Sequence, residues 1–170
     1  MTTISYIIPS LNRPTLQRTI DSIEMWPGDE ICVEYDIPRS FRWGNDQRNK
    51  AIARANGEYL AFIDDDDWYV EGHRQMMQEA IDENPGLPIL FQMEYPDGPI
   101  LWKEKEVKPG NVSTPQIIVP NKPEMLHHWE GARNMADLIF ISKWKFPEII
   151  WKEQILVKLG HPDGQAVHHE

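Results

Sequence analysis

Four consecutive aspartates, Asp64 to Asp67, carry the clearest chemical signal in the sequence. They directly follow the apolar run YLAFI, so they are predicted to lie at the end of a buried strand. Adjacent carboxylates repel one another, and a cation placed among them removes that cost. Alternate residues of an extended segment point to the same side, which predicts that Asp64 and Asp66 face one way and Asp65 and Asp67 the other.

Two interpretations fit this acidic run. Mg²⁺ and Mn²⁺ prefer oxygen ligands and combine one or two carboxylates with substrate phosphates, so the run is suited to a metal and a phosphorylated ligand. The competing interpretation is a solvated acidic turn in which Asp67 caps the following helix. An EF-hand calcium loop is excluded, because the aspartates are contiguous and no glycine or terminal glutamate follows at the required spacing.

The elements before the acidic run must position it. Apolar spacing predicts alternating strands and helices in the order Ile4–Ile8, Thr15–Met25, Glu30–Tyr35, Asp46–Ala55 and Glu58–Ile63. This alternation is typical of a right-handed parallel α/β unit. Ligands of such sheets bind beyond the carboxyl ends of the strands, where the aspartates are expected.

The rest of the chain is less regular. A helix is predicted at Gly72–Glu83 and strands at Leu87–Met93, Ile100–Trp102, Gln116–Val119 and Ala136–Ile141. The final predicted element is a helix, Pro147–Leu159, with Ile150, Ile155, Leu156 and Leu159 as its apolar face. We therefore expect an α/β fold with a mostly parallel central sheet flanked by helices.

Composition narrows the class of protein. The chain has 170 residues, 41% hydrophobic and 26% charged, which indicates one globular domain. Its net charge of −10 argues against nucleic acid or an anionic membrane as a partner. No run approaches the roughly 18 apolar residues of a membrane span, and the N-terminus does not read as a signal peptide. The single cysteine, Cys32, cannot form an internal disulfide, so a cytoplasmic location is expected.

Two segments resemble the family 2 glycosyltransferases, which have the GT-A fold. They are SYIIPSLNRPTLQRTIDSI and GNDQRNKAIARANGEYLAFIDDDDWY, and the likeness lies mainly in residues 3–75. The resemblance implies a single GT-A-like domain over 1–170. Residues 1–93 would form the half that binds a nucleotide-sugar, and 94–170 the acceptor and catalytic half.

The resemblance also implies roles for individual residues. Asp66 would coordinate Mn²⁺ or Mg²⁺ with support from Asp64, and Asp65 would contact the ribose. The remaining donor contacts would come from the first-strand turn, the end of the second strand and the second helix: Pro9, Ser10, Asn12, Glu34, Asp36 and Arg48. Since the family has an aspartate where Glu34 and Asp36 are the nearest matches, the nucleotide could be UDP or GDP.

Inverting members of this family use a late carboxylate as general base. The matching pair here is Glu153-Gln154, and glutamine cannot accept a proton at neutral pH. Glu153 and Asp137 are therefore the two candidate bases. A histidine sometimes completes the metal site of this fold, for which the candidates are His127, His128, His161 and His168.

The first hypothesis is thus a metal-dependent, inverting glycosyltransferase that moves a sugar from a UDP- or GDP-linked donor to an unidentified acceptor, with a second subunit as a possible contributor to the site. The alternative is a glycosyltransferase-like binding or assembly protein that has lost turnover, because Gln154 replaces the usual base and the second half of the chain is reduced. A phosphatase with an aspartate nucleophile is disfavoured, since Trp68 stands where its D-x-D-x-T/S pattern needs a hydroxyl.

Overall fold

The computed structural model describes residues 1–132, 135–144 and 149–160. The predicted helix Pro147–Leu159 is described from residue 149 on. Two of the four histidine candidates, His161 and His168, lie outside the described residues. Within the described residues the elements alternate as predicted up to residue 62. They are β1 (Ile4–Ser10), α1 (Leu16–Asp21), β2 (Glu30–Tyr35), α2 (Asn45–Arg54) and β3 (Tyr59–Phe62). Helix α1 is shorter than the predicted Thr15–Met25.

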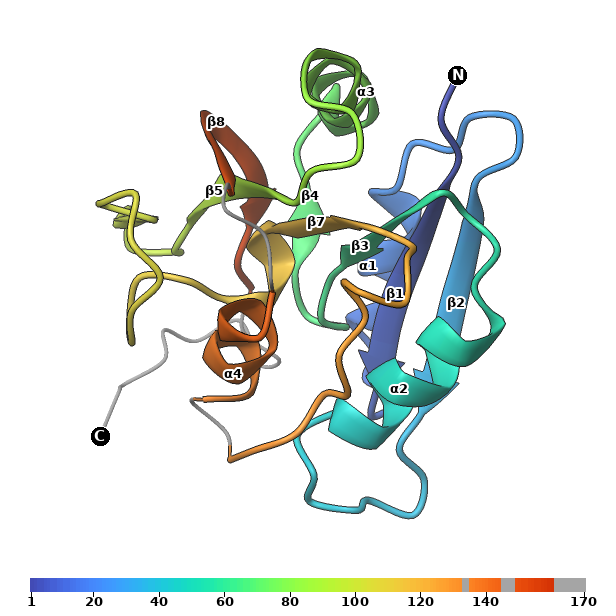
Figure 1. The fold of residues 1–170 in the computed structure, drawn as a ribbon. Helices are drawn as coiled ribbons and strands as arrows, with labels where there is room; N and C mark the ends of the chain where they lie inside the picture. Colours follow the sequence, from blue (N-terminus) through green and yellow to red (C-terminus); the bar gives the residue numbers. More distant parts are fainter. Residues whose placement is uncertain (133–134, 145–148, 161–170) are drawn as a thin grey trace.

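The second half adds further strands to the same sheet, together with two α-helices and one 3₁₀ helix. These elements are β4 (Trp68–Tyr69), α3 (His73–Glu83), β5 (Ile89–Glu94), β6 (Ile100–Leu101), the 3₁₀ helix η1 (Thr114–Gln116), β7 (Ile117–Pro120), α4 (Ala136–Ser142) and β8 (Ile150–Lys158). The strand order is β2-β1-β3-β7-β5-β8-β4, and β6 pairs with β5. Strands from both predicted halves of the chain therefore share one sheet (Figure 1).

The α/β prediction is confirmed, and the sheet is mixed. Strand β1 pairs in parallel with β2 and β3, and β5 with β8. Strand β7 runs antiparallel between β3 and β5, and β4 and β6 are also reversed. Among the described strands, five thus share one direction and three oppose it, so the parallel arrangement belongs mainly to the part that carries the aspartates.

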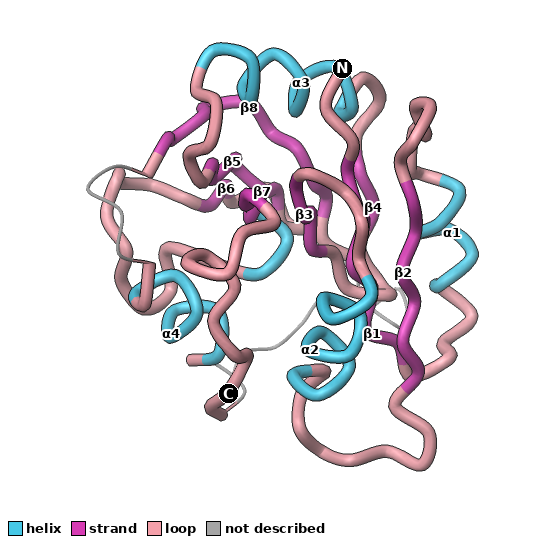
Figure 2. The backbone as a smooth tube through the Cα atoms, turned by 45° about the vertical axis from the view of Figure 1, so that its right-hand side comes forward, coloured by secondary structure: helices cyan, strands magenta, loops and turns pink. Residues whose placement is uncertain are grey.

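Helices cover both faces of the sheet, which explains why its strands are continuous apolar runs. One core packs α1 and α3 against alternate residues of the strands, including Tyr6, Ala61 and Phe91. The other packs α2 and α4 against the intervening residues, including Ile7, Phe62 and Leu90. In Figure 2, α1 and α2 lie on opposite sides of β2. The Cys32 thiol belongs to this second core, where burial raises its pKa.

Two predicted elements of the second half are wrong. Ala136–Ile141 forms helix α4, because a short apolar run fits a buried helix turn as well as a strand. Ala136, Phe140 and Ile141 face the core at helical spacing, with the Phe140 ring stacked on Trp129 at 4.3 Å.

The predicted helix Pro147–Leu159 is wrong for its described part, which forms strand β8. The register passes from Phe91–Lys152 to Gln92–Ile155, so Glu153 and Gln154 bulge out of the pairing with β5. That bulge gives Ile150, Ile155 and Leu156 a spacing that imitates a helix. Because β-branched Ile150, Ile155 and Val157 favour a strand, residue type was the better signal than spacing.

Candidate active site

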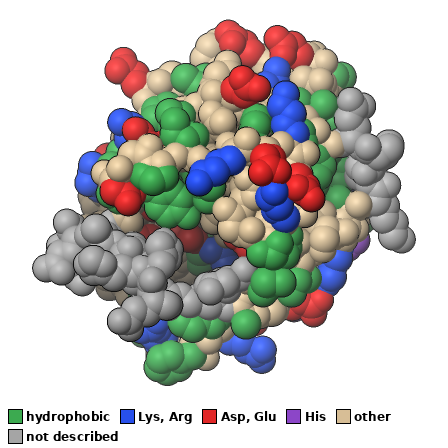
Figure 3. All heavy atoms as spheres, turned by 90° about the vertical axis from the view of Figure 1, so that its left-hand side faces the viewer, with side chains coloured by type: hydrophobic (Ala, Val, Ile, Leu, Met, Phe, Trp, Pro, Cys, Tyr) green, Lys and Arg blue, Asp and Glu red, His purple; other side chains and the backbone are tan. Residues whose placement is uncertain are grey.

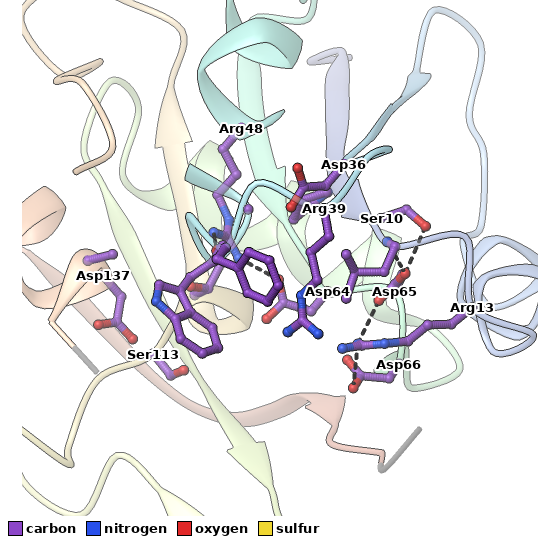
Figure 4. Close-up of a pocket in the computed structure, with 17 residues that line it drawn as sticks. Ser10, Arg13, Asp36, Arg39, Arg48, Asp64, Asp65, Asp66, Ser113 and Asp137 are labelled. Carbon is purple, nitrogen blue, oxygen red and sulfur yellow. Dashed lines mark hydrogen bonds and ion pairs between the residues drawn. The ribbon is translucent and has the colours of Figure 1, made fainter. Parts of the chain in front are cut away.

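A cavity of about 330 Å³ opens where β1, β2 and β3 end. One wall carries the ends of these strands and the loop before α2, and the other carries η1 and the start of α4. Its lining residues are Pro9, Ser10, Leu11, Arg13, Asp36, Arg39, Phe41, Trp43, Gly44, Arg48, Asp64, Asp65, Asp66, Ser113, Thr114, Ala136 and Asp137. Figure 4 shows Asp137 and Ser113 across the cavity from Asp65 and Arg13.

The four aspartates alternate in burial, but the prediction that neighbours face opposite sides is wrong. The run is a turn, in which the Asp67 amide donates to the Asp64 carbonyl at 3.2 Å, and Asp64, Asp65 and Asp66 all line the cavity. Asp65 and Asp67 are buried, whereas Asp64 and Asp66 are partly exposed toward the cavity. Asp67 does not cap the next helix, because β4 intervenes and Gly72 occupies the cap position of α3. Its Oδ1 atom instead accepts a hydrogen bond from the Gly160 amide at 3.0 Å, which ties the end of β8 to the acidic run.

Asp65 is fixed by the turn that follows β1. Its Oδ2 atom accepts hydrogen bonds from the Ser10 hydroxyl at 2.7 Å and the Leu11 amide at 2.9 Å. Its Oδ1 atom pairs with Nη1 of Arg13 at 2.9 Å. The Ser10 hydroxyl also accepts the Asn12 amide, which holds the left-handed Asn12 in this turn. Asn12 itself does not line the cavity within the described residues, while Pro9 and Ser10 do.

Two arginines pair with the other two aspartates of the run that line the cavity, Asp64 and Asp66. Nη1 of Arg13 also lies 2.9 Å from Asp66, so one nitrogen bridges two carboxylates (Figure 4). Nη2 of Arg48 lies 2.5 Å from Asp64. Arg48 is nearly buried, donates to the Trp43 carbonyl and lies over the Trp129 ring. Charge-assisted hydrogen bonds of this kind are the strong ones, so both pairs shape the floor of the cavity.

The acidic run has more carboxyl groups than arginine partners, and two of its members hold their protons more tightly than usual. Burial raises the pKa of Asp66 to about 7, and the Asp64 and Asp65 carboxylates add to the effect against the opposing Arg13. Burial also raises the pKa of Asp67 well above its usual range. The cavity lining holds five carboxylates against three guanidinium groups. Full ionisation would leave two excess negative charges, the amount that one divalent cation neutralises.

Glu34 and Asp36, near the end of β2, are the two candidates for contacting the nucleotide base, and their side chains lie in different places. Asp36 lines the cavity, and its Oδ1 atom accepts the Ser40 amide and the Gln47 amide group, each at 2.9 Å. Glu34 is turned away, pairs with Arg54 at 2.7 Å, and is not part of the cavity lining. Of these two candidates, Asp36 lines the cavity and Glu34 does not.

The loop between Asp36 and α2 forms an aromatic rim. Phe41 and Trp43 line the cavity with 69% and 42% of their surface exposed. Both have left-handed backbone, at φ 58° and 57°, which is unusual for bulky residues and often marks a functional loop. The Arg39 guanidinium lies 5.0 Å over the Phe41 ring. The rim thus offers flat apolar surface next to a positive charge.

The two candidate general bases, Asp137 and Glu153, lie in different places relative to the cavity. Asp137 lies in the first turn of α4 and lines the cavity. Burial raises the pKa of its carboxyl, against the Leu138 amide, Arg48 and Ser113, so it is a stronger base than an ordinary aspartate. Glu153 lies on β8, outside the cavity lining, with 73% of its side chain exposed and an ion pair to Lys105 at 3.6 Å.

The surface around Glu153 is an ordinary charged one. Lys158 pairs with Glu94 at 3.2 Å on the neighbouring strands. Figure 3 shows one face of the molecule, on which acidic, basic and hydrophobic side chains are mixed. Gln154 is exposed on the same strand and is not part of the cavity lining.

The described histidines stay out of the cavity lining. His127 Nε2 is buried without a hydrogen-bond partner among the described residues, and His128 Nε2 lies 3.1 Å from the Asn49 amide. No group of three or more His, Cys, Asp or Glu side chains in the described residues is arranged to hold a metal by itself. A metal at Asp64 and Asp66 would therefore need ligands from a bound molecule.

Sequence reasoning missed five of the cavity residues that carry chemistry: Arg13, Arg39, Phe41, Trp43 and Ser113. Arg13 belongs to the SLNRP turn that supports the resemblance, so its charge next to a predicted phosphate site was the available signal. Arg39, Phe41 and Trp43 lie in a polar loop, DIPRSFRWGND, where exposed aromatics next to arginines were the signal. Ser113 had no local signal, because only the tertiary fold brings η1 to the cavity.

Comparison with known proteins identifies a family whose sequence model matches this chain. Residues 37–137 match the sequence model for glycosyl transferase family 2. The matched range includes the acidic run and Asp137, and the first-strand turn lies before it. A Haemophilus influenzae protein named as an uncharacterized glycosyltransferase is 24% identical over 144 residues, covering 70% of this chain and 49% of that protein. The chain thus spans about half the length of the curated relative it matches.

Solved structures share the fold. Staphylococcus aureus TarS superposes with a TM-score of 0.73 at 16% identity, over 95% of this chain and 37% of TarS. TarS residues 1–349 in complex with UDP-GlcNAc give 0.71 at 17% identity, over 98% of this chain and 62% of that one. Identities this low show the fold alone. Among the described residues, no helix is long and apolar enough to cross a membrane.

Proposed function

The chain belongs to glycosyl transferase family 2, and on that premise we propose that it transfers a sugar from a nucleotide-sugar, most simply a UDP-linked one, to an acceptor hydroxyl. The observation that carries this proposal is the cavity itself. It joins the donor-side groups Ser10, Asp36 and Asp64 to Asp66 with a basic carboxylate, Asp137, on the opposite wall. A donor and an attacking hydroxyl would meet between these walls.

The donor-side residues take the roles that the family resemblance predicts. Pro9, Ser10 and Asp36 would hold the base, Asp65 the ribose, and Arg48 the diphosphate. The fixed positions of Asp36 and Asp65, each accepting hydrogen bonds from neighbouring backbone amides, support binding without large rearrangement. UDP-GlcNAc is the first donor to test, because the TarS fold neighbour was solved with it.

A divalent cation fits this site. The cavity lining holds more carboxyl than guanidinium groups, and the carboxylates of Asp64 and Asp65 beside Asp66 favour a bound positive charge. Asp66, with Asp64 in support, would hold Mn²⁺ or Mg²⁺, and the donor phosphates would supply the remaining ligands, as is usual for Mg²⁺ in phosphate sites. When bound, the cation would neutralise charge on the leaving diphosphate.

Asp137 is the proposed general base. Its carboxylate would accept the proton of the acceptor hydroxyl as the oxygen bonds to the anomeric carbon and the bond to the diphosphate breaks. A raised pKa brings a base closer to neutral pH, where general base catalysis is most effective. A base on the wall opposite the diphosphate supports direct displacement with inversion.

The alternative of a binding protein without turnover loses one of its two motivations. It rested on Gln154 in place of a base and on the reduced second half, and Gln154 is exposed on β8, outside the cavity lining. The Asp137 carboxylate in the cavity lining supports an active enzyme over an assembly protein. Homo-oligomer formation and a cytoplasmic location stay predictions, and the acceptor is unidentified.

The test compares Asp137→Asn with Glu153→Gln, since both remove one carboxylate. UDP-GlcNAc hydrolysis to water with Mn²⁺ is measured for each variant and for wild type, and UDP binding by calorimetry. We expect Asp137→Asn to lower turnover by roughly 10²–10⁴-fold and to keep UDP affinity, since general base catalysis has that size. Glu153→Gln should stay within a few-fold of wild type. Absence of Mn²⁺-dependent UDP binding in wild type would overturn the proposal.

A further inference from the structure

We infer that Arg13 makes metal binding depend on the nucleotide, by occupying the metal-binding carboxylate until a diphosphate arrives. The inference rests on the proposed function and assigns a role to a residue outside it. It concerns the order in which ligands enter the cavity. Arg13 would be a positioning residue, because it acts through Asp66 and the incoming phosphates.

Contact geometry supports this role. A single nitrogen, Nη1 of Arg13, lies 2.9 Å from Asp65 Oδ1 and 2.9 Å from Asp66 Oδ2. It stands between the proposed ribose contact and the proposed metal ligand. A cation bound at Asp66 would replace the guanidinium as the counter-charge of that carboxylate, so the two compete.

Arg13 differs from the second arginine of the site in how firmly it is held. Arg48 is fixed by the Trp43 carbonyl, the Trp129 ring and Asp64, with 5% of its side chain exposed. The Arg13 side chain is 29% exposed, and its polar partners among the described residues are the two carboxylates. Arg13 can therefore turn away from Asp66 more readily than Arg48 can leave Asp64.

The charges predict cooperative binding. A metal that enters alone must displace Arg13 from Asp66 and leave the guanidinium with Asp65 as its one partner. A metal that enters with a diphosphate offers the displaced guanidinium a new anionic partner, for which the planar arginine fork is well suited. Metal should therefore bind more tightly when nucleotide is present, and by linkage nucleotide should bind more tightly when metal is present.

The experiment measures Mn²⁺ affinity with and without saturating UDP, by the electron paramagnetic resonance signal of free Mn²⁺. Wild type is compared with Arg13→Gln and with Arg18→Gln as a matched control. Arg18 lies 3.5 Å over the Trp68 ring, next to the acidic run, and is exposed. Removing it changes the net charge by the same amount without touching the cavity lining.

For wild type we expect UDP to tighten Mn²⁺ binding by at least tenfold. For Arg13→Gln we expect nucleotide-free Mn²⁺ affinity to rise by about tenfold and the enhancement by UDP to fall to a few-fold, since one competing contact is gone. Arg18→Gln should behave as wild type. Arg13→Lys, which keeps the charge without the planar fork, should give an intermediate enhancement, and it serves if the glutamine variant does not fold.

The outcomes are separable. Unchanged nucleotide-free Mn²⁺ affinity in Arg13→Gln, or the same increase in Arg18→Gln, overturns the role of Arg13 while leaving the proposed function intact. If the lysine variant is the one that folds, an enhancement equal to that of wild type overturns it. If wild type binds no Mn²⁺ even with UDP, the proposed function fails as well.

Discussion

Replacing Asp66 by asparagine should stabilise the ligand-free protein at alkaline pH. The Asp66 side chain is 18% exposed and lies beside Asp64 and Asp65. Its ionised form is therefore poorly solvated and repelled by its neighbours, and Arg13 offsets only part of this cost. Asparagine is close in shape and can still accept a hydrogen bond from Arg13, so the change removes mainly the charge.

The size of the effect follows from the pKa. In the unfolded chain the carboxyl ionises near 3.8, and in the folded protein at about 7. The folded state thus holds the proton more tightly, and stability falls as pH rises from 3.8 to 7. At roughly 1.4 kcal/mol for each tenfold change in proton affinity, the total is about 4 kcal/mol, of which about 2.5 kcal/mol falls between pH 5 and pH 8.

Denaturant unfolding of both proteins at pH 5 and pH 8 measures this difference, without metal or nucleotide. The advantage of Asp66→Asn over wild type should be about 2.5 kcal/mol larger at pH 8, or about 5 to 10 °C in melting temperature for a chain of this size. Comparison at the same pH cancels other titrating groups. Asp21→Asn, an exposed aspartate on α1, controls for net charge and should show no such pH dependence.

An equal advantage at both pH values would refute the reasoning, because it would mean that Asp66 is ionised as easily in the folded as in the unfolded state. A decrease in stability at pH 8 would refute it more directly. It would show that the ion pair with Arg13 outweighs burial and repulsion. The same variant should bind UDP without added affinity from Mn²⁺, which calorimetry tests.

Three further predictions concern the scaffold of the site. Gly44→Ala should lower the free energy of unfolding by about 1–3 kcal/mol in denaturant titrations and weaken UDP binding, because φ is +75° and the new Cβ would lie 2.8 Å from Pro9; an unchanged protein would contradict the tight contact. Arg74→Met should lower the free energy of unfolding by about 3–5 kcal/mol in the same assay, because the Asp29 carboxylate would stay buried without the Arg74 guanidinium that lies 2.6 Å away. A loss below about 1 kcal/mol would argue against full burial of this ion pair. The imidazole of His73, whose pKa burial lowers to about 4, should stay neutral in nuclear magnetic resonance titrations down to that pH, whereas titration near 6.5 would show an exposed ring.

The part of the cavity at the ends of β1 and β3 was predictable because its signals are local in sequence. Asp64, Asp65 and Asp66 follow the apolar strand β3 within a few residues, so the sequence predicts where they lie. It does not predict that they form a turn in which all three line one cavity. The choice between Glu34 and Asp36 was not local. It depended on which of the two side chains lies at the cavity. Asp36 follows β2 and lines the cavity, whereas Glu34 lies on β2 and pairs with Arg54.

The second half could not be derived in the same way, because its elements are short and their apolar runs are ambiguous. ADLIFI fits a strand or a helix equally well in isolation, and packing against Trp129 and Phe62 selects the helix. The bulge at Glu153 gave β8 a false helical spacing. Tertiary contacts select the helix at ADLIFI, whereas in β8 the β-branched residues were a local signal for a strand that the spacing outweighed.

The two wrong predictions, for Ala136–Ile141 and for Pro147–Leu159, bear on which residue is assigned as the general base. If Ala136–Ile141 were a strand, Asp137 would be one polar residue at its start, with no reason to face the donor. As the first turn of α4, the segment places the Asp137 carboxyl at the cavity wall, beside Ser113 and across from Arg13. If Pro147–Leu159 were a helix, Glu153 would be free to face the same cavity. As part of an exposed bulge of β8 it lies outside the cavity lining and pairs with Lys105. The assignment of Asp137 over Glu153 is therefore a consequence of the secondary structure of two segments, and the hydrolysis assay on the two variants tests that structure as well as the chemistry.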